Sequence, residues 1–240
     1  MAKRLIYSMK RNNIILSIPD YDNALSNNNR RKIVKAISQM QGVTSFSNIE
    51  RSTGVKANVL THNLRKLQKF RVIDMVTKGT YKLRYRTPLC YICQQQSKHT
   101  DVVYVGLLGK KDSRQIPETA VALQLLASTQ LYPKLVYVST SIDGLESWRN
   151  LKLPYYWITL YEDEIFDIDT IKQKIRPQLE SLLREFLVIL DCTSATKPAT
   201  VAYYELAREY LIPLVYVYEQ SKKLKWLIST DSLAKTLFLQ

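Results

Sequence analysis

Hydrophobic and polar positions between residues 28 and 70 repeat with the period of amphipathic helices. The pattern predicts three helices, over Asn28–Met40, Ser45–Arg51 and Lys56–Phe70. Gly42 and Gly54 follow the first two helices as stop signals. In the third helix, Leu60, Leu64 and Leu67 share one face, which we expect to be buried.

Two extended runs, Val72–Thr77 and Tyr81–Arg86, follow the third helix and are joined at Lys78-Gly79. This pattern predicts a β-hairpin, whose second strand alternates basic and apolar residues. Upstream of the helices, Ile14–Ile18 is a candidate strand, and Asp20–Asn29 is rich in turn-forming residues and predicts a linker.

The pattern changes after residue 100, where apolar runs alternate with helical stretches. Strands are predicted at Val102–Leu108, Lys134–Thr140, Tyr155–Tyr161, Leu187–Leu190, Leu214–Tyr218 and Lys225–Ile228. Helices are predicted at Pro117–Thr129, Ile171–Phe186 and Pro198–Leu211, with Val121, Leu125 and Leu126 facing inward and the second helix kinked or begun afresh at Pro177. Such alternation predicts a Rossmann-like, mostly parallel sheet with helices on both faces. The predicted fold class is therefore α/β.

Ligands of parallel sheets bind outside the carboxyl ends of the strands, where two loops, Gly109–Pro117 and Asp191–Pro198, attract attention. The second loop lies in the stretch Leu187–Ala202, which predicts a buried strand, a polar turn and the first turn of a helix. A helix N-terminus with Lys197 beside it suits a phosphate group, although an ordinary strand–helix connection would show the same pattern.

Charge is distributed unevenly along the chain. Residues 1–100 contain 19 lysines and arginines against four acidic residues, whereas the rest contains 16 basic and 17 acidic residues. A first part this basic indicates a polyanionic partner, nucleic acid or an anionic membrane surface, and we favour double-stranded DNA. A solubilising surface is the alternative, although such surfaces usually mix both signs.

Three helices followed by a basic hairpin form a winged helix-turn-helix, and the stretch GVTSFSNIERSTGVKANVLTHNLRKLQKFRVIDMV resembles prokaryotic transcription regulators of that family. The resemblance implies that the third helix enters the major groove and that the hairpin touches DNA backbone or minor groove. By their chemistry, Asn58, Thr61, His62 and Arg65 are candidates for reading base edges. The candidates for phosphate contact are Lys56, Lys66, Lys69, Lys78, Lys82 and Arg84. Solvated helix faces and contacts to another protein remain alternatives.

Several site classes are absent from the sequence. No G-x-G-x-x-G follows the first strand of the second part and no phosphate-loop motif is present, which argues against dinucleotide cofactors and phosphate-loop NTPases. Neither His62 nor His99 lies beyond residue 100, which excludes a histidine-based triad there.

Cys90 and Cys93 with His99 make only a weak zinc signal, so we predict no metal. The three cysteines are too few for a disulfide framework, and no apolar run is long enough for a signal peptide or a spanning helix, which predicts a cytoplasmic protein without a membrane partner.

Two segments, VGLLGKKDSRQIPETAVALQLL and LVILDCTSATKPATVAYYELA, resemble the CARF domain, the CRISPR-associated Rossmann fold, over residues 101–230. That family usually carries an Asp-x-Thr-Gly-Gly-Thr-Lys-like motif after the strand. This chain keeps Asp191, Thr193, Thr196 and Lys197, and has Ser194 and Ala195 in place of the two glycines. The domains we predict are therefore an N-terminal segment (1–27), a winged helix-turn-helix (28–88), a linker (89–100) and a CARF-like domain (101–240).

The resemblance implies a cyclic oligoadenylate ligand, most simply cyclic tetra-adenylate, which signals in CRISPR antiviral defence, and a homodimer with the ligand on its two-fold axis. It also implies ligand contacts at Lys110, Lys111 and Ser113, besides Asp191, Thr193, Ser194, Thr196 and Lys197. A CARF domain joined to a winged helix resembles CRISPR-linked archaeal transcription regulators, with the order of the two domains reversed here. No cofactor is expected.

The expected function is thus a DNA-binding transcription regulator gated by a cyclic oligoadenylate. One alternative is a metal-independent ring nuclease that cleaves this ligand, with Lys197 and Ser113 as its candidate catalytic residues. Another is a sensor of a different small anion. A ribonuclease with an Arg-x4-His motif is not expected, because neither histidine lies in such a motif.

Overall fold

The structure, a computed structural model, describes residues 18–93, 101–151, 153–194, 196–218 and 221–238. These residues form two compact units. One comprises the described residues up to Tyr85 together with those from Lys235 onward, and the other comprises Arg86–Ala234. The strand predicted at Ile14–Ile18 falls almost wholly outside the described residues. None of the described helices is long and apolar enough to cross a membrane.

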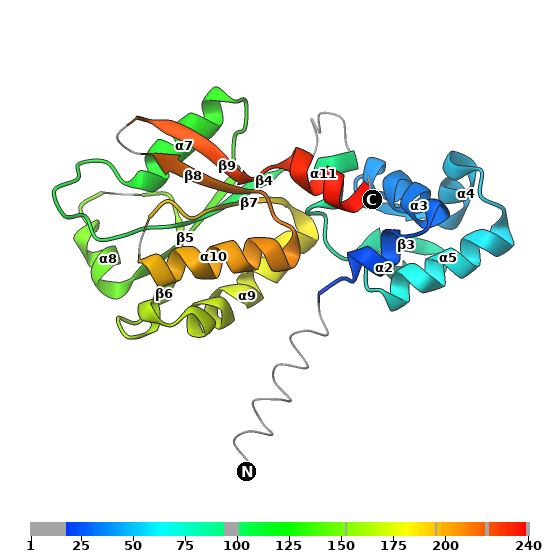
Figure 1. The fold of residues 1–240 in the computed structure, drawn as a ribbon, viewed down its shortest axis with the longest axis horizontal. Helices are drawn as coiled ribbons and strands as arrows, with labels where there is room; N and C mark the ends of the chain where they lie inside the picture. Colours follow the sequence, from blue (N-terminus) through cyan, green and yellow to red (C-terminus); the bar gives the residue numbers. More distant parts are fainter. Residues whose placement is uncertain (1–17, 94–100, 152, 195, 219–220, 239–240) are drawn as a thin grey trace, which may run out of the picture. The chain divides into compact units, whose positions relative to one another are not determined.

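The N-terminal unit combines helices with a small antiparallel sheet (Figure 1). Its elements are α2 (Tyr21–Leu25), α3 (Asn28–Gln39), β1 (Val43–Ser45), α4 (Phe46–Thr53), α5 (Ala57–Lys69), β2 (Ile73–Thr77) and β3 (Thr80–Leu83). The sheet has the order β1-β3-β2, so the predicted hairpin gains a third strand, β1, which the sequence pattern did not reveal.

The prediction of a linker over Asp20–Asn29 was wrong, because α2 forms there. The Asp20 carboxylate accepts the backbone N–H of Asn23 and caps this short helix. Arg30, on the first turn of α3, does not point into solvent, since its Nε donates to the carbonyl of Ala24 at 2.6 Å. In α4 the N-cap is Ser45, whose hydroxyl accepts the N–H of Asn48.

The C-terminal unit is built on a six-stranded sheet with the order β6-β5-β4-β7-β8-β9. Its strands are β4 (Val102–Leu107), β5 (Leu135–Ser141), β6 (Tyr156–Leu160), β7 (Leu187–Asp191), β8 (Leu214–Tyr218) and β9 (Lys223–Ile228). All neighbouring pairs are parallel except β8 and β9. The expectation of a mostly parallel, Rossmann-like sheet is confirmed.

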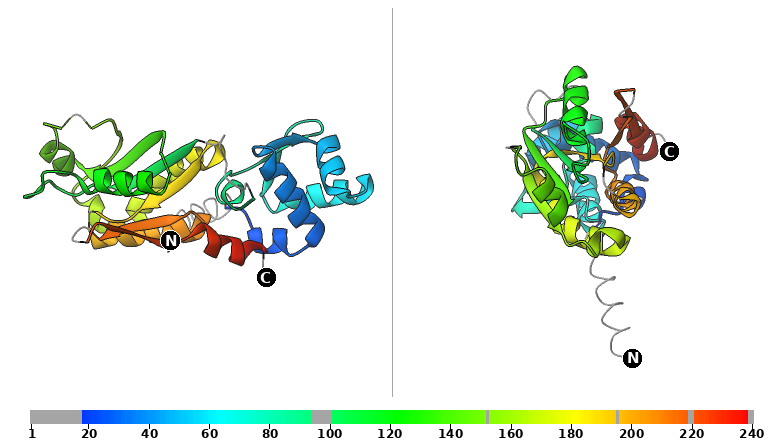
Figure 2. Two further views of the ribbon diagram at one scale, coloured as in Figure 1. Left: turned by 90° about the horizontal axis from the view of Figure 1, so that it is seen from above. Right: turned by 90° about the vertical axis from the view of Figure 1, so that its left-hand side faces the viewer.

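Helices cover both faces of this sheet (Figures 1 and 2). The covering helices are α7 (Glu118–Ser128) on one face and α9 (Ile168–Glu185) with α10 (Lys197–Tyr210) on the other. The other described helices after β3 are α6 (Leu89–Cys93), α8 (Ile142–Ser147), the 3₁₀ helix η1 (Glu164–Phe166) and α11 (Thr230–Phe238), whose residues from Lys235 onward belong to the N-terminal unit. On one face, Ala122 and Leu126 of α7 pack against Tyr104 and Ile189. On the other, Tyr203 of α10 reaches Ser139, where the two hydroxyls are 2.7 Å apart.

Helix α9 departs from its prediction. It starts at Ile168 and continues without interruption through Pro177, which we expected to kink or restart it. Ile175 and Leu179, on either side of the proline, are both buried. Burial of one apolar stripe on both sides therefore outweighs the hydrogen bond that the proline removes.

Candidate functional site

The strand order places a topological switch point between β4 and β7. From β4 the chain continues to β5 and β6 on one side, whereas from β7 it continues to β8 on the other. The loop after β4 leads to α7 on one face, and the turn after β7 leads to α10 on the opposite face. Connections that part in this way leave a crevice at the carboxyl ends of the strands, where α/β proteins bind their ligands.

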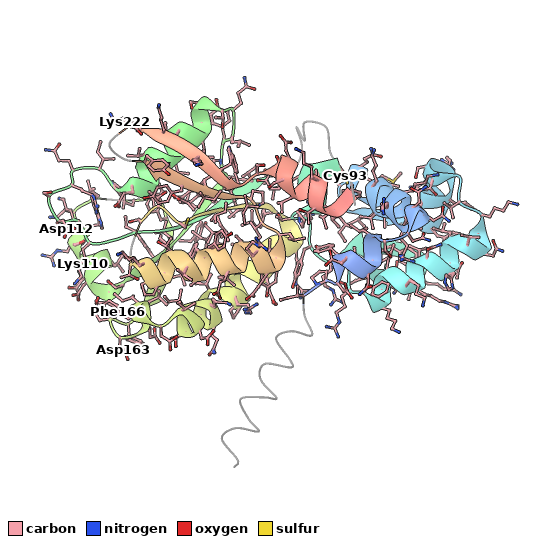
Figure 3. The ribbon with its side chains drawn as sticks, viewed as in Figure 1. Cys93, Lys110, Asp112, Asp163, Phe166 and Lys222 are labelled. Carbon is pink, nitrogen blue, oxygen red and sulfur yellow. The ribbon has the colours of Figure 1, made fainter. Side chains whose placement is uncertain are left out.

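A cavity of about 440 Å³ lies at this switch point. It is lined by Leu107, Leu108, Gly109, Lys110, Asp112, Arg114, Glu118, Ser139, Thr140, Ser141, Leu160, Glu162, Ile165, Phe166, Thr193, Ser194, Thr196 and Ala199. Figure 3 labels Lys110, Asp112 and Phe166 at this end of the C-terminal unit. Both predicted loops contribute to the cavity, together with the ends of β5 and β6 and with η1.

Ser194 joins the two loops inside the cavity wall. Its buried hydroxyl accepts the backbone N–H of Gly109 at 2.9 Å and donates to Glu118 Oε2 at 2.9 Å. Glu118 is 4% exposed and forms an ion pair with Arg114 at 2.9 Å. The Ser194 hydroxyl thus belongs to a hydrogen-bond network that connects the loop after β4 with the start of α7. Ala195 lies outside the described residues.

Asp191 ends β7 below the cavity and is 1% exposed. It accepts hydrogen bonds from the hydroxyls of Tyr104 and Thr193 and from the Thr193 N–H. Burial raises the pKa of this carboxyl to about 6, even though these hydrogen bonds act in the opposite direction. Asp191 therefore shapes the start of the turn, and its carboxylate is shielded from the cavity.

Gly106 makes room for that arrangement. Tyr104 lies two residues before Gly106, on the same face of β4. Its ring passes over Gly106, and its hydroxyl donates to Asp191. A Cβ at Gly106 would come within 2.5 Å of the Tyr104 ring. Any larger residue here would displace the tyrosine and remove its hydrogen bond to Asp191.

The N-terminus of α10 opens beside the cavity. Thr196 is its N-cap, and its hydroxyl accepts the Ala199 N–H and donates to the Ile165 carbonyl at 2.8 Å. Lys197 is exposed at the first helical position, and Pro198 follows it in the first turn, as the sequence predicts. The free N–H groups and the positive end of the dipole favour an anion at this position.

The loop after β4 is held by polar contacts. Lys110 lines the cavity and pairs with Asp143 at 2.6 Å, and the Asp143 carboxylate raises the pKa of this lysine. The backbone N–H of Lys111 donates to Ser147, and its ammonium lies 5.8 Å from the centre of the Trp148 ring. Ser113 is exposed on the loop.

The structure thus brings together half of the predicted nucleotide-binding residues. Lys110, Thr193, Ser194 and Thr196 line the cavity. Lys111, Ser113, Asp191 and Lys197 are not among the lining residues. Ligand contact by any of the eight stays a prediction.

Several residues that line the cavity were not predicted from the sequence. Ser139, Thr140 and Ser141 end β5, and their polarity after an apolar strand was a usable signal. Arg114 and Glu118 have the spacing of a helical ion pair, which was also readable. Phe166 gave no signal, because the one-turn helix η1 has no periodicity.

In the N-terminal unit, α5 presents the predicted polar face. Leu60, Leu64 and Leu67 are buried, as expected. Asn63 is buried as well, and its amide donates to the Val59 carbonyl at 2.8 Å. The exposed residues of the face are Lys56, Asn58, His62, Arg65 and Lys69, whereas Thr61 and Lys66 are half-buried. The Thr61 hydroxyl donates to the Ala57 carbonyl.

The β2–β3 hairpin carries the other predicted DNA contacts. Lys78 is exposed at the turn, where Gly79 has a positive φ of 81° that favours glycine. Lys82 is half-buried. Arg84 is paired with Asp74 across the hairpin, its Nε 3.3 Å from the carboxylate. That pair neutralises much of the charge that we expected Arg84 to offer a phosphate.

The candidate zinc ligands Cys90 and Cys93 are buried on α6, and burial raises the pKa of the Cys90 thiol to about 12. His99 lies outside the described residues. Within the described part of the chain, no three histidine, cysteine or acidic residues are grouped so that they could hold a metal ion.

No protein-family model matches the sequence, and no curated protein matches it either. Solved structures match part of it. Protein VC1899 from Vibrio cholerae has 17% identity and a TM-score of 0.41, over 54% of this chain and 34% of that one. Can2 from Sulfobacillus thermosulfidooxidans, in complex with cyclic tetra-adenylate, has 15% identity and a TM-score of 0.38, over 54% and 35%. Csm6 from Enterococcus italicus, bound to cyclic hexa-2'-fluoro-hexa-dAMP, has 11% identity and a TM-score of 0.40, over 57% and 43%. The chain therefore spans well under half the length of each of these proteins.

Proposed function

We propose that this protein is a DNA-binding regulator whose C-terminal unit senses a cyclic oligoadenylate. One observation carries the proposal. The cavity lies at the switch point between β4 and β7 and is lined by Lys110, Thr193 and Thr196, which the CARF-like motifs single out. A phosphate at the N-terminus of α10 would meet free N–H groups, the Thr196 cap and the Lys197 charge.

The size of the cavity is consistent with part of a cyclic oligonucleotide. At about 440 Å³ it lies near the small end of the range for ligand pockets. A ring of four nucleotides would need two such cavities. Two copies of this chain related by a two-fold axis would supply them, which is why the proposal includes a homodimer.

The proposed DNA-binding module is the N-terminal unit, read as a winged helix-turn-helix. Exposed cations and polar side chains lie on the face of α5 opposite its buried leucines. On the hairpin, Lys78 adds a further exposed positive charge. An exposed face of this composition at a helix of 13 residues suits the major groove. Binding of the nucleotide would then change DNA affinity, and DNA would change nucleotide affinity by the same factor.

Cleavage of the ligand is outside this proposal. Its two candidate residues, Ser113 and Lys197, are not among the residues that line the cavity. Product analysis after incubation with labelled cyclic tetra-adenylate tests the point directly, because linear products would establish a ring nuclease.

The deciding experiment titrates the full chain with duplex DNA at fixed salt, with and without cyclic tetra-adenylate. We expect DNA affinity to change in its presence, and equal affinities would refute the gating. Lys197→Ala should weaken nucleotide binding about tenfold through loss of a charge-assisted contact. Lys134→Ala is the matched control, because Lys134 pairs with Asp101 outside the cavity lining. If both variants bind the nucleotide like the wild type, the turn after β7 is only a strand–helix connection.

A further inference from the structure

The charges that line the cavity almost cancel. Its two cationic residues, Lys110 and Arg114, are paired with Asp143 and Glu118, at 2.6 and 2.9 Å. Asp112 and Glu162 add negative charge to the same lining, which with Glu118 contains three acidic residues against two basic ones. Attraction of phosphates by these side chains is therefore weak, and an oligonucleotide held here needs a contact to another part of its structure.

Phe166 offers a contact of a different kind. It lines the cavity and is nevertheless 66% exposed. Leu160, Ile165 and Ala199 add apolar side chains to the same lining. Covering a large, water-exposed aromatic ring with a flat apolar partner buries much apolar surface, which contributes favourably to the free energy of binding.

The turn that carries Phe166 is held by contacts of the two residues before it. The Ile165 carbonyl, immediately before it, accepts the Thr196 hydroxyl at 2.8 Å. Glu164 accepts the Tyr161 N–H at 2.9 Å and pairs with Lys174 at 3.0 Å. These contacts reduce the entropy lost when a ligand orders the ring. They also tie the turn directly to the N-cap of α10.

We propose that Phe166 stacks on a nucleobase of the ligand while a phosphate of that ligand lies at the N-terminus of α10. Every base has a π-face, and stacking on an aromatic side chain binds bases largely independently of their hydrogen-bonding edges. Adenine, a purine, offers a large face for this contact. The assignment rests on the proposed function, since it names a group that grips the same ligand.

Affinity measurements with cyclic tetra-adenylate test the stacking contact. Phe166→Ala should weaken binding roughly 5- to 150-fold, the range found for loss of one base stack. Phe166→Leu should weaken it nearly as much, because it keeps apolar area but loses the π-face, whereas Phe166→Trp should bind at least as tightly as the wild type. Tyr132→Ala is the control, because Tyr132 is 70% exposed and does not line the cavity.

Fluorescence supplies a readout that simple loss of packing would not produce. The tryptophan introduced by Phe166→Trp should be quenched by cyclic tetra-adenylate beyond any change of Trp148, Trp157 and Trp226 in the wild type. Inorganic tripolyphosphate, which carries charge but no base, should leave that emission unchanged.

The outcomes separate the two proposals. If the wild type binds no cyclic oligoadenylate, the proposed function fails and the stacking contact fails with it. If the wild type binds and Phe166→Ala and Phe166→Leu bind equally well, only the stacking contact is refuted. A loss of affinity in Phe166→Ala that follows a loss of dimer in light scattering would also refute it, because Phe166 would then be a contact between protomers.

Discussion

The polar face of α5 and the cavity of the C-terminal unit handle charge in opposite ways. On α5, Arg65 and Lys69 are exposed to water. In the cavity, Lys110 and Arg114 are paired with carboxylates of the same chain. Exposed cations attract a polyanion over a long range and release its counterions, whereas paired ones favour a ligand by shape and short contacts. One chain thus presents exposed cations on α5 and internally paired cations in the cavity.

The largest expected difference between the two regions is in their dependence on salt. About six phosphate contacts would lower DNA affinity by roughly 10³-fold between 50 and 200 mM salt. Substituting Arg65, Lys69 and Lys78 together by alanine should reduce the slope of log K against log salt by about three. Anisotropy titration of labelled duplex DNA at several salt concentrations measures it.

A matched control removes the same charge from the other unit, by changing Lys222, Lys223 and Lys225 to alanine. All three are exposed at or beside β9. Equal slopes for the two triple variants would show that the α5 face does not carry DNA binding. Nucleotide affinity should fall less steeply with salt than DNA affinity in every variant, because the nucleotide makes fewer phosphate contacts.

The next effect concerns the buried carboxyl of Asp191 at the end of β7. The folded-state pKa of Asp191, about 6, lies above its ordinary value of 3.8, so the folded state retains the proton longer as pH rises. The stabilising contribution is therefore fully present below about pH 4 and is lost as pH rises through about 6. A shift of that size corresponds to about 3 kcal/mol.

Asp191→Asn should remove this pH dependence, because the amide cannot ionise. Urea unfolding followed by tryptophan emission reports on the C-terminal unit, which contains Trp148, Trp157 and Trp226. Between pH 4 and pH 7 the stability of the wild type should fall relative to the variant. Asp143→Asn, at the surface, is the control, and parallel curves for wild type and Asp191→Asn would contradict the prediction.

The smallest predicted effect is that of the hydroxyl between the two loops. Ser194→Ala removes a donor and an acceptor and leaves the Gly109 N–H and Glu118 without that partner. We expect a loss of about 1–3 kcal/mol in the same unfolding measurement. Ser113→Ala, on the exposed part of the loop, should change stability by less than about 0.5 kcal/mol. Equal stabilities would mean that water replaces the Ser194 hydroxyl.

The strand and the helix that flank the turn of the site were predicted correctly from the sequence. The run Leu187–Leu190 and the pattern after Pro198 predicted β7 and α10 to within a residue or two, because each has a clear period and a clear boundary. The N-terminal hairpin and the covered, mostly parallel sheet followed from the same kind of pattern, whereas the third strand of the small sheet, β1, did not. Periodicity reports which residues face a core, and that suffices for elements of this length.

The sequence could not foretell the contacts within the cavity. Ser194 meets Glu118 across 76 residues, and nothing local to either residue indicates the pairing. The helix α8 has six residues and depends on the cap that Ser141 provides, too short a stretch for a period to show. Arg30 donates to the carbonyl of Ala24, a contact between α2 and α3 that periodicity does not predict. Long-range hydrogen bonds and one-turn elements are set by tertiary structure, which a local pattern does not contain.

The hydroxyl of Thr196 connects the turn that carries Phe166 with the first turn of α10. The hydroxyl accepts a hydrogen bond from the Ala199 N–H inside α10 and donates one to the Ile165 carbonyl beside Phe166. A valine here would keep the shape and sever both connections at once. One substitution at residue 196 would therefore loosen the turn that carries Phe166 and the first turn of α10 together.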